Sequence, residues 1–198
     1  MQAVYYSHPF FMRTLIILAI FAMSFTLRSH AEEIIPGVLT FDCPTNFGGF
    51  GSGEEPGDPP FPQRFGYREY LANDGRQINI NVRMVECYTN KGYGLLIREP
   101  DDNELKEKLA GLIKSYSNAT NAPPVVDTII DGQKAISISY VSHVGPMTLH
   151  FENYWVKVQS NAVVEILLST TADSEENLHS MRPYLSKIKI LKKYSPSK

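Results

Sequence analysis

The sequence predicts an α+β fold in which an antiparallel sheet carries two helices packed on one face. Several segments alternate apolar and polar residues and are joined by Asp-Gly turns, which is typical of antiparallel hairpins. Two other segments repeat apolar residues at the helical period. Removing an N-terminal export segment leaves 167 of the 198 residues, which is enough for a single domain with its own core.

Residues 1–31 have the pattern of a secretory signal peptide. Arg13 precedes 14 uncharged residues, Thr14 to Leu27, and the small-residue pattern Ser29-His30-Ala31 follows. A positive start, an apolar stretch of about 7–15 residues and an A-x-A-like end define such a peptide. A transmembrane helix needs roughly 20 apolar residues, so a retained signal anchor is the alternative. We expect residues 32–198 to be periplasmic or secreted, with no stable membrane insertion after cleavage.

The mature chain is mildly acidic. Residues 1–31 hold two of the 19 Lys and Arg residues and none of the 21 Asp and Glu residues. The mature chain therefore has 17 basic and 21 acidic residues, a net charge of −4. Such a surface gains nothing from the phosphate backbone, which supplies most non-specific nucleic-acid affinity. We therefore expect no nucleic-acid partner. The partner that we expect, on the grounds given below, is another protein.

The two cysteines, Cys43 and Cys87, are predicted to form a disulfide. An exported protein meets an oxidising compartment, where an even number of cysteines favours pairing. The bridge would close a loop with 43 residues between the cysteines, worth about 4 kcal/mol in the chain-entropy model. Two unpaired buried thiols are the alternative.

The elements before the first helix begin with a strand at 38–42. Residues 45–66 contain six of the 13 glycines and a cluster of prolines, which predicts a long surface loop. Residues 67–71 and 77–87 form the next strands, with a turn at Asn73-Asp74-Gly75. The second of these strands places Asn79, Asn81 and Arg83 opposite an apolar face of Ile78, Ile80, Val82 and Met84.

A helix is predicted over 102–117. Asp101 and Asp102 lie at its start, where carboxylates cap free N–H groups and oppose the positive end of the helix dipole. A stripe at the helical period faces the core, and Pro123-Pro124 cannot extend the helix. The stripe consists of Leu105, Leu109, Leu112, Ile113 and Tyr116.

Four strands follow, at 125–130, 133–140, 147–158 and 162–170, with an Asp131-Gly132 turn between the first two. A second helix begins near Asp173 and carries Leu178, Met181 and Leu185, and Pro183 is expected to distort or shorten it. Ile188 and Ile190 indicate a last strand. We expect Trp155 to pack in the core, although a stacking site with its aromatic neighbours is the alternative.

The region from Thr128 to Leu191 resembles the PsbP-like superfamily, which includes DcrB-type exported bacterial proteins. The resemblance is carried by Ile130-Asp-Gly-Gln-Lys-Ala135, by Tyr154-Trp155, by the strand Val163 to Leu168, and by a closing helix that leads into Ile188-Lys-Ile190. The inserted Gly/Pro segment and the cysteine pair depart from the simple pattern. The resemblance implies a protein that binds or scaffolds other proteins instead of catalysing a reaction.

No catalytic or cofactor motif is found, and we expect no cofactor. The glycines at 49, 51 and 53 precede Glu54-Glu55, which would repel a phosphate, so they are no P-loop. His150 and Glu152 share a strand face as two metal ligands could, but a third ligand is not identifiable, so an exposed polar face is favoured over a metal site. Asn118-Ala-Thr120 is a glycosylation sequon if the source is eukaryotic.

The segment 45–66 is the predicted partner-binding surface. Aromatic side chains in a loop are costly to leave in water unless they meet a partner or pack onto the domain, and the second possibility is the alternative here. The acidic residues would favour a basic surface on the partner. The residues expected to bind are Phe47, Phe50, Glu54, Glu55, Asp58, Phe61 and Phe65.

These observations predict an exported, non-enzymatic protein-binding module. One form of it is a periplasmic immunity or inhibitor protein that neutralises an envelope-acting toxin or hydrolase. The alternatives are a PsbP-like scaffold or assembly factor of an envelope complex and, from another class, a metal-dependent hydrolase built around His150 and Glu152.

Overall fold

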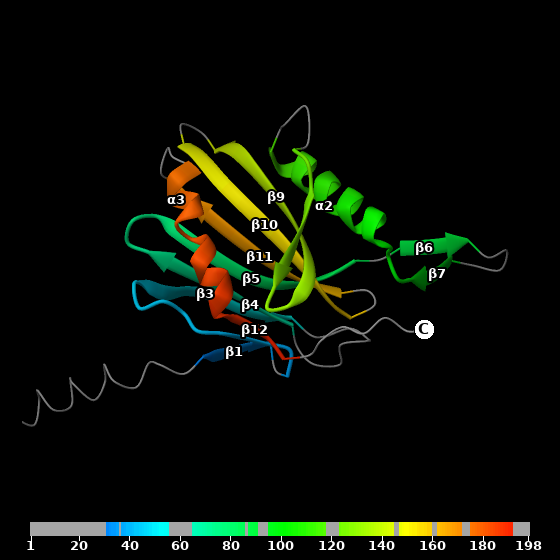
Figure 1. Cartoon of the computed structure of the whole chain (residues 1–198), viewed down its shortest axis with the longest axis horizontal. Helices are drawn as coiled ribbons and strands as arrows, with labels where there is room; N and C mark the ends of the chain where they lie inside the picture. The colour runs from blue at the N-terminus through cyan, green and yellow to red at the C-terminus, as the bar shows by residue number, and fades with distance from the viewer. Residues whose placement is uncertain are drawn as a thin grey trace, which may run out of the picture. The chain divides into compact units, whose positions relative to one another are not determined.

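Figure 1 shows the computed structural model of the chain. The structure describes residues 31–35, 37–55, 65–85, 87–90, 95–117, 123–144, 147–159, 162–171 and 175–191. Within these ranges the strands form three sheets, all paired antiparallel, accompanied by α-helices. The predicted α+β class is therefore confirmed. The proposed signal peptide lies outside these ranges except for Ala31.

The largest sheet has seven strands in the order β3-β4-β5-β11-β10-β9-β8. They are β3 (Phe47–Glu55), β4 (Phe65–Ala72), β5 (Arg76–Met84), β8 (Val126–Ile130), β9 (Gln133–Val144), β10 (Met147–Gln159) and β11 (Ala162–Thr170). A three-stranded sheet contains β1 (Glu32–Ile35), β2 (Leu39–Phe41) and β12 (Ile188–Ile190), and a hairpin contains β6 (Cys87–Asn90) and β7 (Leu95–Arg98). The helices are α2 (Asp102–Ser117), α3 (Glu175–His179) and the 3-10 helix η1 (Arg182–Lys187).

The chain reverses direction at two Asp-Gly turns, and the backbone angles of these residues explain why. Asp131 and Gly132 join β8 to β9 and both have positive φ, 48° and 76°, as the tightest hairpin turn requires. Gly75 has φ 82°, and a Cβ at this position would meet the side-chain oxygen of Thr171. Glycine is therefore favoured at position 75 by its backbone angle, which other residues rarely adopt.

The two faces of the large sheet belong to different cores. Because side chains alternate along a strand, Tyr154 and Val156 of β10 enter one core whereas Trp155 enters the other. The first core contains Leu178 of α3 and Met181, which follows that helix, together with residues of the three-stranded sheet. The second core is closed by α2 through Leu105, Leu109 and Ile113. The prediction that both helices pack on one face is wrong, since α2 and α3 cover opposite faces.

The last predicted helix is divided into two short pieces, α3 and η1. Pro183 occupies the first turn of η1, where its missing N–H costs nothing, so the expected shortening is confirmed. Met181 between the pieces is fully buried and anchors both to the sheet. No helix in the described part of the chain combines the length and the apolar character needed to cross a bilayer.

The predicted loop over 45–66 is wrong for Phe47–Glu55, which forms β3 and pairs with β4, and for its last two residues, which begin β4. Glycine weakens a strand, but here the partner strand supplies the backbone pairing, and the register shifts once, between Gly49 and Gly51. Phe47 is 6% exposed and meets Tyr184 edge-on at 5.4 Å, so this side chain packs onto the domain. Residues 56–64, with Asp58 and Phe61, lie outside the described ranges.

The predicted disulfide between Cys43 and Cys87 is not formed in this structure. Cys43 packs against the first core, and its Sγ lies 3.6 Å from the carbonyl oxygen of Pro44. Cys87 is buried at the start of β6, in the separate two-stranded sheet, where it is opposite Arg98. The two cysteines therefore belong to different parts of the fold, which spacing along the chain did not reveal.

Candidate functional site

A groove lies on the face of the large sheet that α2 covers in part. Its volume is about 330 Å³, and a neighbouring hollow of about 300 Å³ shares Glu165 and Leu167 with it. We call the first the Glu165 groove. It is lined by Arg83, Leu112, Ile113, Tyr140, Ser142, Phe151, Asn153, Glu165 and Leu167. These residues come from α2 and from β5, β9, β10 and β11, four neighbouring strands of the sheet.

The polar floor of the groove follows from strand alternation. The apolar face of β5 enters the first core, so Asn79, Asn81 and Arg83 point to the opposite face. Register places Asn81 opposite Glu165 of β11, and Trp155 of β10 lies opposite Glu165 on its other side. A carboxylate in the middle of an otherwise apolar strand is thereby surrounded by hydrogen-bond donors.

Glu165 is 7% exposed and is the centre of this network. Its Oε2 accepts hydrogen bonds from Arg83 Nη2 at 2.7 Å and Arg83 Nε at 3.1 Å, and a long one from Asn81 Nδ2 at 3.5 Å. Its Oε1 accepts from Asn153 Nδ2 at 2.8 Å and Trp155 Nε1 at 3.2 Å. Burying a carboxylate is costly unless it is paired and hydrogen-bonded, and both oxygens meet that condition.

Asn153 brings one unsatisfied acceptor to the groove. The side chain is 3% exposed, and the bond from Nδ2 to Glu165 fixes which way its amide points. Its Oδ1 is the buried side-chain atom that has no hydrogen-bond partner among the described residues. A buried polar atom without a partner costs free energy, so each such atom requires an explanation. A ligand that donates a hydrogen bond into the groove would satisfy it.

Arg83 is the accessible member of the network, with its side chain 33% exposed. Its Nε and Nη2 both bond Glu165 Oε2, which fixes the plane of the guanidinium group. Among the described residues, Nη1 of Arg83 bonds no acceptor. Arg83 therefore places available N–H donors at the groove that Asn153, with its buried acceptor, also lines.

The remaining walls of the groove are mainly apolar. Leu112 and Ile113 of α2 form one side, and Leu167 of β11 lies beside Glu165. Tyr140 and Phe151, directly opposite each other on β9 and β10, stack with ring centroids 4.8 Å apart and planes 10° from parallel. The groove thus combines a polar floor with apolar sides, as small recognition sites commonly do.

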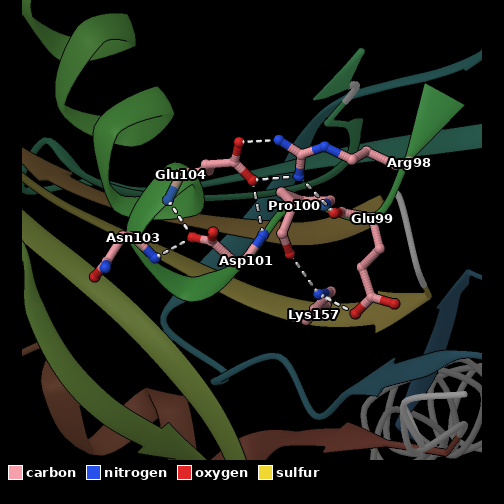
Figure 2. A network of polar contacts seen from close by, with 7 residues as sticks. All are labelled: Arg98, Glu99, Pro100, Asp101, Asn103, Glu104 and Lys157. Carbon is pink, nitrogen blue, oxygen red and sulfur yellow. Dashed lines mark hydrogen bonds and ion pairs between the residues drawn. The ribbon is translucent and has the colours of Figure 1, made fainter. Parts of the chain in front are cut away.

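The position of α2 above the sheet is fixed by a polar network at its first turn, shown in Figure 2. Asp101 Oδ1 accepts from the backbone N–H of Asn103 and Glu104, each at 2.9 Å, and Glu104 Oε2 accepts from Asp101 N at 3.0 Å. This reciprocal arrangement is a capping box. Arg98 of β7 forms an ion pair with Glu104 and holds the pKa of that carboxyl down at about 2.

A second contact in the same network ties the turn before α2 to the sheet. Lys157 of β10 donates to the carbonyl oxygen of Pro100 at 3.0 Å and forms an ion pair with Glu99 (Figure 2). Lys157 is on the same face of β10 as Trp155 and Asn153, two and four residues earlier. The helix wall of the groove and its polar floor are therefore held to the same strand.

The residues predicted to bind a partner do not meet at this groove. Phe47 is buried on the other face of the sheet. Phe50, Glu54 and Glu55 belong to β3 and Phe65 belongs to β4, at the edge of the sheet away from β10.

Glu152 and His150, the two residues considered as metal ligands, do not form a metal site with each other in this structure: Glu152 is paired with other side chains. Glu152 is 2% exposed, forms an ion pair with Arg182 of η1 and accepts from Tyr154 at 2.6 Å. Burial opposes ionisation of Glu152, but the hydrogen bonds from Arg182 and Tyr154 outweigh it and lower its pKa. Burial and then the bond to Glu152 raise the pKa of Tyr154. His150 is partly buried on β10 opposite Thr170. Glu152 therefore fastens η1 to the sheet.

Glu165, Asn153 and Arg83 were not among the functional residues expected from the sequence. Two signals were present: Glu165 interrupts the apolar run Val163 to Leu168, and the polar face of β5 carries two asparagines and an arginine. The pairing of β5 with β11 is needed to bring these signals together, since Asn81 and Glu165 are 84 positions apart in the sequence. Comparisons of the chain with protein-family models, with curated proteins and with solved structures return no match.

Proposed function

We propose that this chain is an exported, non-enzymatic binding module that recognises a partner protein through the Glu165 groove. The observation that carries the proposal is the buried Oδ1 of Asn153, an acceptor without a partner among the described residues, in a groove that also offers Arg83. Unsatisfied buried atoms are rare in folded proteins, and a bound partner would remove the cost of this one. Export follows from the signal-peptide pattern of residues 1–31.

The hydrogen bonds of Glu165 favour binding over catalysis at this groove. A general base needs a lone pair within reach of a substrate proton. Both oxygens of Glu165 already accept hydrogen bonds from Arg83, Asn153 and Trp155. A carboxylate held in this way orients its neighbours, so the role that suits it is to fix the Arg83 donors and the Asn153 acceptor.

Two kinds of partner are consistent with an exported binding module. An immunity or inhibitor protein would neutralise a toxin or hydrolase that acts in the envelope. A scaffold or assembly factor would join an envelope complex, as the resemblance to the PsbP-like superfamily implies. We favour the first because a preorganised groove on a small rigid sheet suits tight one-to-one recognition.

Site-specific photo-crosslinking in the native envelope tests the proposal. A benzophenone amino acid would replace Leu112, which lines the groove, or Lys114, an exposed residue of the same helix that points away from it. We expect a discrete protein adduct from position 112 and none from position 114. The identity of the adduct, by mass spectrometry, distinguishes a toxin or hydrolase from a component of an envelope complex. Equal labelling at both positions, or none at either, would contradict binding at this groove.

A further inference from the structure

We propose that the Glu165 groove recognises an uncharged, extended peptide segment of the partner, with Arg83 donating to a peptide carbonyl and Asn153 accepting from a peptide N–H. This inference rests on the proposed function and specifies its ligand chemistry. The same experiment that tests it also separates a peptide from a carbohydrate or a small anion.

The groove offers a hydrogen-bond donor and a hydrogen-bond acceptor side by side. The Glu165 network leaves the Nη1 donors of Arg83 and the Oδ1 acceptor of Asn153, and both residues line one groove. A ligand that satisfies both must present an acceptor beside a donor. The peptide group has this combination in every residue, and in an extended segment its C=O and N–H groups point away from the chain axis.

The charges in the groove favour an uncharged ligand. The charged side chains that line the groove are Arg83 and Glu165, and they pair with each other at 2.7 Å. Because this pair is internally neutral, a carboxylate, phosphate or ammonium group entering the groove would lose hydration without finding an uncompensated opposite charge. An uncharged ligand avoids that cost. The peptide backbone is uncharged, whereas a free amino acid or a phosphate is not.

The walls of the groove favour a peptide with an apolar side chain. Leu112, Ile113 and Leu167 offer aliphatic surface next to the polar floor. Tyr140 and Phe151 stack on each other, so each ring already uses one face within the protein and does not offer that face to a sugar ring. Aliphatic walls beside paired polar groups suit a peptide with an apolar side chain. A volume of about 330 Å³ is near the lower end of the roughly 300–1,000 Å³ of ligand sites, which limits the bound segment to a short one.

The single tryptophan of the chain is a direct reporter of the groove. Trp155 Nε1 donates to the same Glu165 oxygen as Asn153 Nδ2. A ligand that forms a hydrogen bond with Asn153 should alter the hydrogen bond from Asn153 to this shared oxygen. The hydrogen bond from the indole N–H would then change as well, and its NMR resonance would shift. Because one tryptophan gives one indole signal, NMR of isotope-labelled mature protein observes the site without a full assignment.

The probe is N-acetyl-leucine methylamide, which carries two peptide groups and an apolar side chain. We expect a saturable shift of the Trp155 indole signal with Kd of about a millimolar, as the size of the probe allows. The methyl ester analogue has the same shape but lacks one N–H, and should bind roughly tenfold more weakly if Asn153 accepts from that group. Acetate and methyl glucoside should leave the signal unchanged.

The matched variants are Arg83→Gln and Arg76→Gln. Both arginines lie on β5, but Arg76 pairs with Asp74 at the turn and does not line the groove. We expect Arg83→Gln to weaken binding of the probe roughly tenfold and Arg76→Gln to leave it unchanged. The comparison of methylamide with ester uses unaltered protein, so it tests the proposal even if a substitution disturbs folding.

Each remaining outcome has a defined meaning. If the methylamide and its ester bind equally well, or neither shifts the signal while position 112 still crosslinks to a protein, the peptide assignment is wrong and the proposed function stands. A shift caused by methyl glucoside or acetate alone, without a protein crosslink at position 112, would overturn both.

Discussion

Asn153 Nδ2 donates a 2.8 Å hydrogen bond to Glu165 Oε1 on the neighbouring strand, and this bond leaves the other amide atom of Asn153 as a buried acceptor without a partner among the described residues. The two residues are not directly opposite each other, since Glu165 faces Trp155 and Asn153 faces Leu167. The bond is therefore diagonal across β10 and β11. One side chain, Asn153, therefore both stabilises the buried carboxylate of Glu165 and carries the unpaired acceptor from which we infer the binding function.

Glu165→Gln should destabilise the fold. The substitution removes the charge that pairs with Arg83 and places an NH₂ group among donors, so we expect the free energy of unfolding to fall by about 2 kcal/mol in urea titrations. Glu176→Gln, at an exposed position of α3, serves as the control and should change it by less than about 0.5 kcal/mol. Equal small effects of the two substitutions would show that the buried network contributes little.

The contact between Glu152 and Arg182 should make stability depend on acid pH. The pKa of Glu152 is lowered in the folded state from its ordinary value of 4.5, so the unfolded chain binds the proton more readily. The contribution of ionised Glu152 to the free energy of unfolding is complete above pH 4.5, the ordinary pKa. This contribution is lost as the pH falls through the lowered pKa of the folded state. His179 adds to the same effect, because its positive charge also lowers the pKa of Glu152.

Arg182→Gln tests this dependence. Burial raises the pKa of Glu152, and the guanidinium group of Arg182 counteracts that effect. Without this group the pKa of Glu152 should rise, so the protein should begin to lose stability at a higher pH. Urea titrations from pH 3 to pH 6, values chosen to bracket the ordinary range of a glutamate, would measure the shift. Superimposable profiles for wild type and variant would contradict the coupling.

Phe47→Ala should destabilise the fold instead of weakening partner binding. Its ring is buried, meets Tyr184 edge-on and lies 5.7 Å from the guanidinium carbon of Arg76. Removing a buried phenylalanine costs about 3 kcal/mol or more. Leu71→Ala, on the adjacent strand at 38% exposure, should cost much less. Calorimetry of the two variants checks this, and a melting temperature unchanged by Phe47→Ala would restore the idea of a recognition aromatic.

The mature protein should contain two titratable thiols. Cys43 packs against the first core and lies 3.6 Å from the carbonyl oxygen of Pro44, whereas Cys87 is buried in the separate β6–β7 hairpin. Thiol titration of protein denatured without a reductant should therefore find two groups per chain. A result of none would establish the bridge between Cys43 and Cys87 and require a different arrangement of the hairpin.

The strands and turns could be predicted wherever local patterns dominate. Period-two alternation identified the strand that contains Asn79, and the Asp131-Gly132 turn follows from the backbone angles that those two residues tolerate. The glycine-rich β3 was missed because its strand character comes from pairing with β4 and not from its own side chains. The prediction of a disulfide was wrong for a related reason, since the spacing of two cysteines in the sequence does not give their distance in the folded protein.

The sequence by itself determined the α+β class, the position of α2, the Asp-Gly hairpins and which residues of β5 share a face, because these depend on contacts between residues close in the chain. Only the tertiary structure decided that α2 and α3 cover opposite faces and that Arg83, Asn153 and Glu165 meet. These outcomes depend on the order β5-β11-β10, which joins strands far apart in sequence. A carboxylate buried in an apolar strand is stable only with such distant donors, so its role becomes visible when those strands pair.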